Sequence, residues 1–217
     1  MNARTETFEL NVLGGQIPEV CNSIFHTILF LRSTGKYKYK EETSYSIGPV
    51  GAKDEDCDFL DLTYTRADSD QLDLFLKGEI EKFNRALRYN ESLRSGEITL
   101  TFYQKKQKRW PFSQECIPWE MWTLSLKVIH LPNEHERNAY RTNLGMAVGE
   151  KVMYITEIMS RDQYVPKNPN YSELDNVFDS SFPTVQPYLF KIEHTMQSPS
   201  SNVSTTMRKF LKDTLML

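Results

Sequence analysis

Histidine and cysteine are the side chains of this sequence that could bind a metal or attack a substrate, and they are scattered. No histidine has another histidine or a cysteine three or four residues away, so the usual spacing of a metal site is missing. The pair of Cys116 and His130 stays open as a nucleophile and base, because such pairs form in space rather than in sequence. We expect no catalytic residue, no bound metal and no cofactor. The residues concerned are His26, His130, His135, His194, Cys21, Cys57 and Cys116.

An acidic run at 54–58 resembles the start of a calcium-binding loop, with acids at its first, third and fifth positions. The sixth position of such a loop needs glycine for a sharp turn, but here it is Phe59. The twelfth position needs a bidentate glutamate, but here it is Thr65. We therefore interpret the run as a solvated acidic loop. The sequence also contains no glycine-rich phosphate loop and neither the HExxH nor the GxSxG motif.

The most unusual segment combines basic residues with an aromatic residue on each side of a proline. Pro111 has no N–H to donate, so a strand must end before it. Trp110 and Phe112 would then lie at a hairpin tip, where exposed aromatic side chains are suited to anchor a partner. Packing of both rings onto their own domain is an equally supported alternative. The basic residues before them are Lys105, Lys106, Lys108 and Arg109.

This basic stretch also fits contact with nucleic acid or a membrane, or a nuclear-import signal. The whole chain, however, has a net charge of −3, which disfavours general binding to phosphate backbones. We keep nucleic-acid binding as a minor alternative and expect the basic residues to steer a protein partner.

Gly145 and Gly149 lie one turn apart inside a predicted helix. Each costs about 1 kcal/mol relative to alanine in a helix interior, and a close backbone contact offsets such a cost. That contact is made either with the chain's own sheet or with a helix of a partner. The helix face concerned comprises Tyr140, Gly145, Val148, Gly149 and Val152.

The elements that position these residues follow from the periodicity of the apolar side chains. Helices are expected at 16–31, 72–87, 133–159 and 207–215, the second after a capping box at 68–71 and the last one amphipathic. Strands are expected at 7–12, 45–47, 59–64, 98–102, 122–128 and 185–192, and near Val203. The finger at 103–118 completes a long hairpin, and 160–184 is a loop. This order predicts one α+β domain over 1–217, with helices on a mainly antiparallel sheet.

The buried sides of these helices can also be predicted. His26 lies near the buried side of the first helix, where a core histidine is expected rather than a ligand. The inner side of the second helix comprises Leu72, Leu76, Ile80, Phe83 and Leu87. That of the third comprises Tyr140, Leu144, Val148, Val152, Ile155 and Met159.

The composition of the chain indicates the compartment. Three widely spaced cysteines favour free thiols in a reducing environment. The N-terminal residues lack the pattern of a secretory signal, and no apolar run approaches the ~20 residues that a membrane helix needs. We expect a soluble protein of the cytoplasm or nucleus without a transmembrane segment.

Several blocks, together covering much of the chain, resemble one known family. They are STGKYKYKEETSYSIGPVG (33–51), DCDFLDLTY (56–64), FYQKKQKRWPFSQECIPWEMWT (102–123), DNVFD (175–179), VQPYLFKI (185–192) and TTMRKFLKDTL (205–215). In content and order they are similar to the autophagy-related protein 101 family. That family supplies a HORMA-domain subunit to the Unc-51-like autophagy-initiation kinase complex.

The resemblance implies a HORMA fold with three central helices and no enzymatic activity. It implies a heterodimer with the HORMA domain of autophagy-related protein 13, for which the helix face with Gly145 and Gly149 is the candidate surface. Trp110, Pro111 and Phe112 would form the family's finger, which recruits downstream autophagy factors to the sites where autophagosomes form. An open-like conformer is expected, because only about 25 residues follow Ile192. The same resemblance leaves room for a homodimer when the partner is absent.

Three other interpretations remain. The first is a HORMA adaptor of a nuclear or checkpoint signalling pathway. The second is an enzyme that uses Cys116 with His130, or the acids at 54–61. The third is a basic module that contacts membrane or nucleic acid, whose binding would fall steeply with salt.

Overall fold

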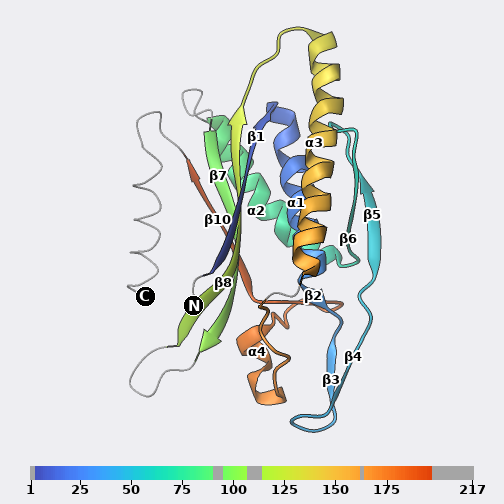
Figure 1. Cartoon of the computed structure of the whole chain (residues 1–217), viewed down its shortest axis with the longest axis vertical. Coiled ribbons are helices and arrows are strands. Elements are labelled where there is room, and N and C mark those ends of the chain that lie inside the picture. The colour runs from blue at the N-terminus through green and yellow to red at the C-terminus, as the bar shows by residue number, and fades with distance from the viewer. Residues whose placement is uncertain (1–2, 90–94, 107–113, 162–163, 197–217) are drawn as a thin grey trace.

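The computed structural model describes residues 3–89, 95–106, 114–161 and 164–196. At the centre of these residues is a sheet of strands Arg4–Val12 (β1), Ser95–Lys106 (β7), Glu115–Val128 (β8) and Phe190–Met196 (β10). The strands lie in the order β1-β8-β7-β10 (Figure 1). β1 and β8 are parallel, whereas the pairs β7–β8 and β7–β10 are antiparallel. The predicted α+β arrangement with a mainly antiparallel sheet is therefore confirmed.

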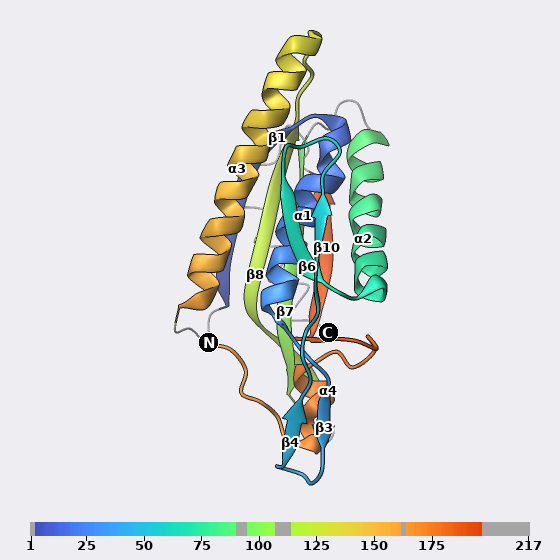
Figure 2. The same ribbon diagram turned by 90° about the vertical axis from the view of Figure 1, so that its right-hand side faces the viewer.

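One face of this sheet is apolar, because alternate side chains of a strand point to the same side. Its register places Phe8 opposite Leu124 and Leu124 opposite Ile98, and all three are buried. The longest helices of the described residues cover this face (Figures 1 and 2). They are α1 (Ile17–Leu31), α2 (Asp70–Tyr89) and α3 (Glu134–Ser160).

α1 is buried over most of its circumference. Pro18 lies in its first turn, where a missing N–H costs no hydrogen bond. At the other end, the Arg32 backbone N–H donates to the carbonyls of Ile28 and Leu29 at 3.0 and 3.3 Å. The Arg32 guanidinium donates to the Glu120 carboxylate on β8 from Nη2 at 2.7 Å and from Nε at 3.2 Å. A buried ion pair thus ties the end of α1 to the sheet.

α2 follows the sequence prediction along its length but not at its start. The predicted inner residues Leu72, Leu76, Ile80, Phe83 and Leu87 are all buried. The predicted cap at Asp68 was wrong, because Ser69 Oγ accepts from the Leu72 N–H at 3.4 Å and the helix begins at Asp70. Asp68 is held by the preceding loop, since its N–H donates to the Gly51 carbonyl at 2.8 Å.

α3 begins where predicted, with Asn133 Oδ1 accepting from the His135 N–H at 2.9 Å. Of its predicted inner residues, Tyr140 and Val152 are only half-buried. The other four are buried: Leu144, Val148, Ile155 and Met159.

Short strand pairs complete the described ranges. They are β2 (Ser33–Thr34) with β9 (Gln186–Pro187), β3 (Tyr37–Tyr39) with β4 (Tyr45–Ile47), and β5 (Ala52–Asp56) with β6 (Thr63–Ala67). The predicted strand at 45–47 is confirmed as β4. Short helical turns lie at Gly14–Gln16 (η1), Tyr171–Glu173 (η2) and Leu174–Val177 (α4).

Two predictions around the acidic run were wrong. The run is not a loop, because β5 contains Asp54 and Asp56, which accept hydrogen bonds from the Thr65 and Thr63 hydroxyls at 2.6 Å each. The strand expected at 59–64 is mainly the turn 57–62 between β5 and β6, closed by a 3.0 Å bond from the Cys57 N–H to the Leu62 carbonyl. The acids are nevertheless solvated, as expected, with Asp54 and Asp56 exposed.

The C-terminal part of the described chain is more regular than predicted. The loop at 160–184 contains η2 and α4. The strand expected at 185–192 is interrupted between β9 and β10, because the Tyr188 N–H donates to the Arg32 carbonyl and the Leu189 N–H to the Val177 carbonyl. The strand near Val203 and the helix at 207–215 lie outside the described residues.

Candidate partner-binding surfaces

The β7–β8 hairpin extends beyond the rest of the sheet. β7 and β8 pair as far as Lys106 opposite Glu115. β1 meets β8 only from Glu120 onward, and β10 meets β7 only as far as Phe102. Residues 103–106 and 115–118 therefore form a two-stranded stem that projects from the sheet (Figure 1).

The base of this stem is braced by aromatic and polar contacts. The register shifts between Phe102 and Tyr103, and Trp119 packs there on Phe102 and Tyr188 with ring centroids 5.5 and 5.3 Å away. The Tyr103 N–H donates to the Leu189 carbonyl at 2.9 Å. These contacts fix the direction in which the stem leaves the sheet.

Two of the residues of the predicted finger lie on this stem. Lys105 is half-buried and Lys106 is exposed on β7. The other finger residues, Lys108, Arg109, Trp110, Pro111 and Phe112, lie outside the described residues. The choice between an exposed anchor and rings packed on their own domain therefore stays a prediction.

The glycine side of α3 packs on the chain itself. A Cβ atom at Gly145 would lie 2.9 Å from the Asp61 carbonyl oxygen, and one at Gly149 would lie 3.7 Å from Leu62 Cδ1. Asp61 also accepts from Thr142 Oγ1 at 2.6 Å and from Arg141 Nε at 2.8 Å. Of the two explanations for the glycines, close packing within the chain is the one found here, although the contact is with the turn 57–62 rather than the sheet.

The five residues proposed as a dimer face consequently do not form an open surface. Val148 is fully buried, Gly145 is covered by the turn, and the Tyr140 hydroxyl donates to the Asn11 carbonyl on β1 at 2.7 Å. Gly149 and Val152 are half-buried. In this conformation Gly145 and Val148 are therefore not accessible to a partner, whereas Tyr140, Gly149 and Val152 are partly accessible.

α3 also exposes two methionines. Met146 is 59% exposed and Met153 is 70% exposed, and they lie two turns apart on one side of the helix. We call this pair the methionine stripe. Thr142 and Gly149 share this side and contact the 61–62 segment, so the stripe runs beside the turn. Methionine is flexible and polarizable, which suits it to a binding surface.

The turn beside the stripe also exposes an apolar side chain, Phe59, at 56%. The Glu19 carboxylate on α1 holds this turn by accepting from the Asp58 N–H at 2.7 Å and the Phe59 N–H at 2.8 Å. Burial raises the pKa of Glu19, although these two donors oppose the shift. Sequence reasoning missed this surface, because apolar residues on both sides of α3 blur the period that would separate them.

Cys116 and His130, which were considered as a catalytic pair, do not meet. Cys116 pairs with Lys105 in the stem, whereas His130 follows the other end of β8, which is roughly 40 Å away at about 3.3 Å per residue. Burial raises the pKa of Cys21, and it raises that of Cys57 to about 12, which is the opposite of what a nucleophilic thiol needs. The hypothesis of a Cys116–His130 pair was therefore wrong.

His26 is a core histidine, as predicted. It is 2% exposed, stacks on Tyr64 with a centroid distance of 5.8 Å, and has Nε2 3.2 Å from Asp73 Oδ1. Burial lowers the pKa of His26, against the opposing effect of Asp73. Burial alone would raise the pKa of Asp73, but the hydrogen bonds from His26 and Lys77 hold it below its usual range.

The described ranges contain neither a metal-binding cluster nor a membrane-spanning helix. No group of three or more His, Cys, Asp or Glu residues there could hold a metal ion. Within the same ranges, no helix is both long enough and apolar enough to cross a membrane.

The known proteins that are similar to this chain all have the same name. Residues 9–172 match the family model of autophagy-related protein 101. The protein of that name from Xenopus tropicalis is 50% identical over 218 residues, which covers 100% of both chains. The one from Homo sapiens is 48% identical over the same coverage, and the one from Arabidopsis thaliana is 27% identical over 65% of this chain and 60% of its own. The vertebrate similarity includes the stem, α3 and the residues outside the described ranges.

Proposed function

The chain belongs to the autophagy-related protein 101 family, and on this premise we propose that it is a non-catalytic adaptor in autophagy initiation. It acts as a subunit of the Unc-51-like kinase complex, in the cytoplasm and at the sites where autophagosomes form. Family membership itself implies the role in autophagy. The observation that carries the adaptor role is the exposed methionine stripe on α3, since two large apolar side chains on one exposed helix side favour a protein interface.

The proposed partner at this stripe is the HORMA domain of autophagy-related protein 13. The chain itself would be a HORMA domain in an open-like conformer, and three helices on one face of a mainly antiparallel sheet are compatible with that fold. Phe59 is a further exposed apolar side chain, on the turn that contacts α3. Gly145 contributes indirectly, because its close contact with Asp61 seats the turn against α3.

A double substitution tests this surface. Met146→Glu with Met153→Glu should leave the melting temperature unchanged, because both side chains are exposed, and should abolish capture of the partner HORMA domain in a pull-down. The matched control is Leu74→Glu on α2, which changes an apolar side chain that is 73% exposed on another helix. Normal capture by the double variant, or equal loss in the control, would contradict the proposed surface.

A second surface would recruit downstream autophagy factors through Trp110 and Phe112. The support for it is the stem, which extends to Lys106 and Glu115 beyond the pairs that β7 and β8 make with β10 and β1. Lys105 and Lys106, with Lys108 and Arg109, would steer acidic partners.

The two surfaces can be separated by experiment. Trp110→Ala with Phe112→Ala should retain folding and partner capture but lose recruitment of downstream factors in cells. The control is Leu74→Ala, which removes a large exposed side chain from α2 and should leave recruitment unchanged. Unfolding of the aromatic double variant, or normal recruitment by it, would refute a separate recruitment surface.

A further inference from the structure

Among the described residues, β1 is an edge strand whose outer side is open. In the described part of the chain it pairs only with β8. The Val12 carbonyl points toward β8, because it accepts from the Ile129 N–H at 2.9 Å. Backbone groups of successive residues point to opposite sides of a strand, so the Asn11 carbonyl points to the free edge, where the Tyr140 hydroxyl binds it. The same alternation turns the N–H and C=O groups of Thr5, Thr7 and Glu9 outward.

These outward groups are available for hydrogen bonding. Thr5, Thr7 and Glu9 are all exposed, and within the described ranges none of their backbone groups has a partner on the free side. A row of unpaired backbone donors and acceptors is a template for another strand.

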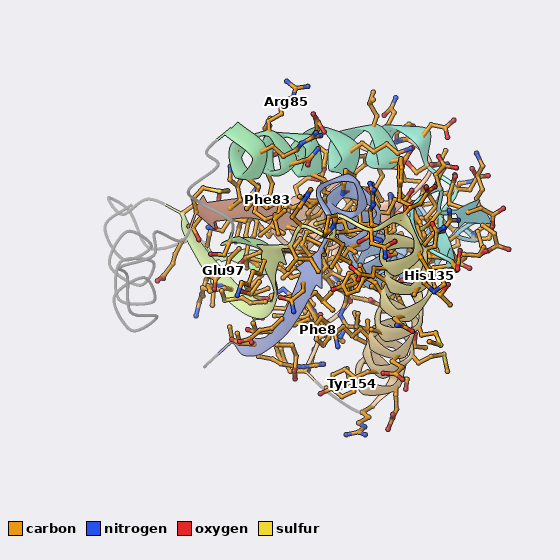
Figure 3. The ribbon with its side chains drawn as sticks, turned by 90° about the horizontal axis from the view of Figure 1, so that it is seen from above. Phe8, Phe83, Arg85, Glu97, His135 and Tyr154 are labelled. Carbon is orange, nitrogen blue, oxygen red and sulfur yellow. The ribbon has the colours of Figure 1, made fainter. Side chains whose placement is uncertain are left out.

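α3 provides a wall beside this edge. Tyr154 contacts Phe8 of β1 edge to face, with ring centroids 6.1 Å apart, and remains 42% exposed (Figure 3). Lys151 Nζ lies 5.5 Å from the centroid of the same Phe8 ring. A strand added to β1 would therefore place alternate side chains next to Tyr154, which gives the edge an apolar contact as well as backbone bonds.

The charge of the β1 edge indicates which kind of strand it can bind. Glu6 and Glu9 lie on β1, and no ion pair to either is found among the described residues. Glu150 is exposed on α3 one turn from Tyr154. Of the nearby cations, Arg4 faces Glu120 at 3.8 Å and Lys151 lies over Phe8. Lys151 keeps its charge and Lys127 lies opposite Asn11 on β8, but Glu6, Glu9 and Glu150 outnumber these two cations, so the net charge of this edge is negative.

The other candidates fit less well. The opposite edge strand, β10, is shorter, and its Lys191 and Glu193 neutralise each other at 2.8 Å. A second copy of β1 would bring Glu6 and Glu9 toward the same residues of its neighbour, and like charges across strands are destabilising.

We propose that the β1 edge binds an extended, basic segment of another protein by strand addition. In antiparallel pairing, the favoured pattern is a basic residue opposite Glu9, an apolar one opposite Phe8, a β-branched one opposite Thr7 and a basic one opposite Glu6. This site is distinct from the methionine stripe and from the 107–113 segment, so it does not depend on either.

Synthetic peptides test the site on the full-length protein. The probe is the capped hexapeptide Ser-Lys-Leu-Thr-Lys-Ser, and its counterpart has glutamate in place of both lysines. We expect the basic peptide to bind at least about tenfold more tightly in fluorescence anisotropy, with an affinity that falls as salt rises. Equal binding of the two peptides would overturn the proposal.

Two changes test the backbone pairing. Thr7→Pro removes one N–H from the free edge and none from the ladder with β8, so peptide affinity should fall roughly tenfold. A peptide N-methylated at the residues that face β1 tests the same bonds with the protein unaltered, so a folding defect in the proline variant cannot confuse the result. Unchanged binding of the N-methylated peptide would refute strand addition.

A charge-reversal pair locates the site. Glu9→Lys should weaken the basic peptide and strengthen the acidic one, whereas Glu193→Lys on β10 should change neither. If only Glu193→Lys affected binding, the site would lie on the other edge. If sedimentation showed a dimer that Thr7→Pro dissolves, the occupant would be a second copy and the proposal would be wrong.

Discussion

α1 and α3 lie on the same face of the same sheet, yet their apolar side chains serve different purposes. α1 is enclosed on nearly all sides, with eleven buried residues. α3 buries Val148 and Ile155 against the chain but exposes Met146 and Met153. The difference teaches that apolar character alone does not assign a helix residue to the core. What decides its role is whether another part of the chain, such as the turn 57–62, covers it.

The largest change in stability is expected for the ion pair at the end of α1. Glu120→Ala should lower the free energy of unfolding by about 3–5 kcal/mol, because Arg32, only 6% exposed, would be left as an unpaired buried charge. Urea denaturation measures the change. Glu157→Ala, which breaks an exposed ion pair with Arg161 on α3, should have no measurable effect. Similar losses in the two variants would break the contrast between the helices.

Truncating one apolar side chain on each helix sharpens the same contrast. Ile24→Ala on α1 removes a fully buried side chain and should cost about 2–5 kcal/mol. Met153→Ala on α3 should change stability by less than about 0.5 kcal/mol, because the side chain is exposed. Chemical denaturation of both variants gives the comparison, and a large loss at Met153 would show that it supports the fold.

The two glycines of α3 should respond in opposite directions. Gly145→Ala should destabilise the protein by about 1–3 kcal/mol, because its Cβ would lie 2.9 Å from the Asp61 carbonyl oxygen. Gly149→Ala should stabilise it by up to about 1 kcal/mol, because the new Cβ makes an ordinary contact with Leu62 at 3.7 Å and alanine favours a helix. Thermal melts measure whether each substitution raises or lowers the stability. If both substitutions changed the stability in the same direction, the turn 57–62 would not pack on α3 as described.

The smallest effect concerns pH and the contact between α1 and α2. Because burial lowers the pKa of His26 below its ordinary value near 6.5, the unfolded chain binds more protons in that range. The stabilisation from neutral His26 is complete above pH 6.5 and is lost as pH falls. Melting temperatures from pH 7.5 to 5.5 should therefore decline less steeply in His26→Gln than in the wild type. If the melting temperatures of the wild type and of His26→Gln fell equally with pH, His26 would not contribute to the pH dependence.

Parts of the fold that depend on one local pattern were predictable. The inner residues of α2 follow from a single apolar stripe, and the cap at Asn133 from one side chain. In other segments, contacts with residues distant in the sequence determine the secondary structure. Phe59 and Leu60 suggested a strand, but the Asp58 and Phe59 N–H groups donate to the Glu19 carboxylate, which holds this segment in a turn. The acidic β5 has little strand propensity of its own and depends on the threonine hydroxyls of β6.

The candidate surfaces also combine features that a local pattern reveals with features that depend on distant contacts. The composition of the 105–112 segment is visible in the sequence, and so is the oddity of Gly145 and Gly149. What the glycines contact was not, because the turn 57–62 lies about 80 residues earlier in the chain. The methionine stripe could only be found once that turn was known to cover Gly145 and to leave the neighbouring methionines exposed.

The pairing of β1 with β8 has a consequence for synthesis of the protein. β1 leaves the ribosome first, but β8 follows roughly 110 residues later, which at about 5–20 residues per second is a delay of roughly 5 to 20 seconds. During that time Phe8, Leu10 and Val12 have no strand to pair with and no completed core to enter. Closure of the sheet must therefore be a late, long-range folding step, and the nascent chain offers chaperones an apolar N-terminal strand until it occurs.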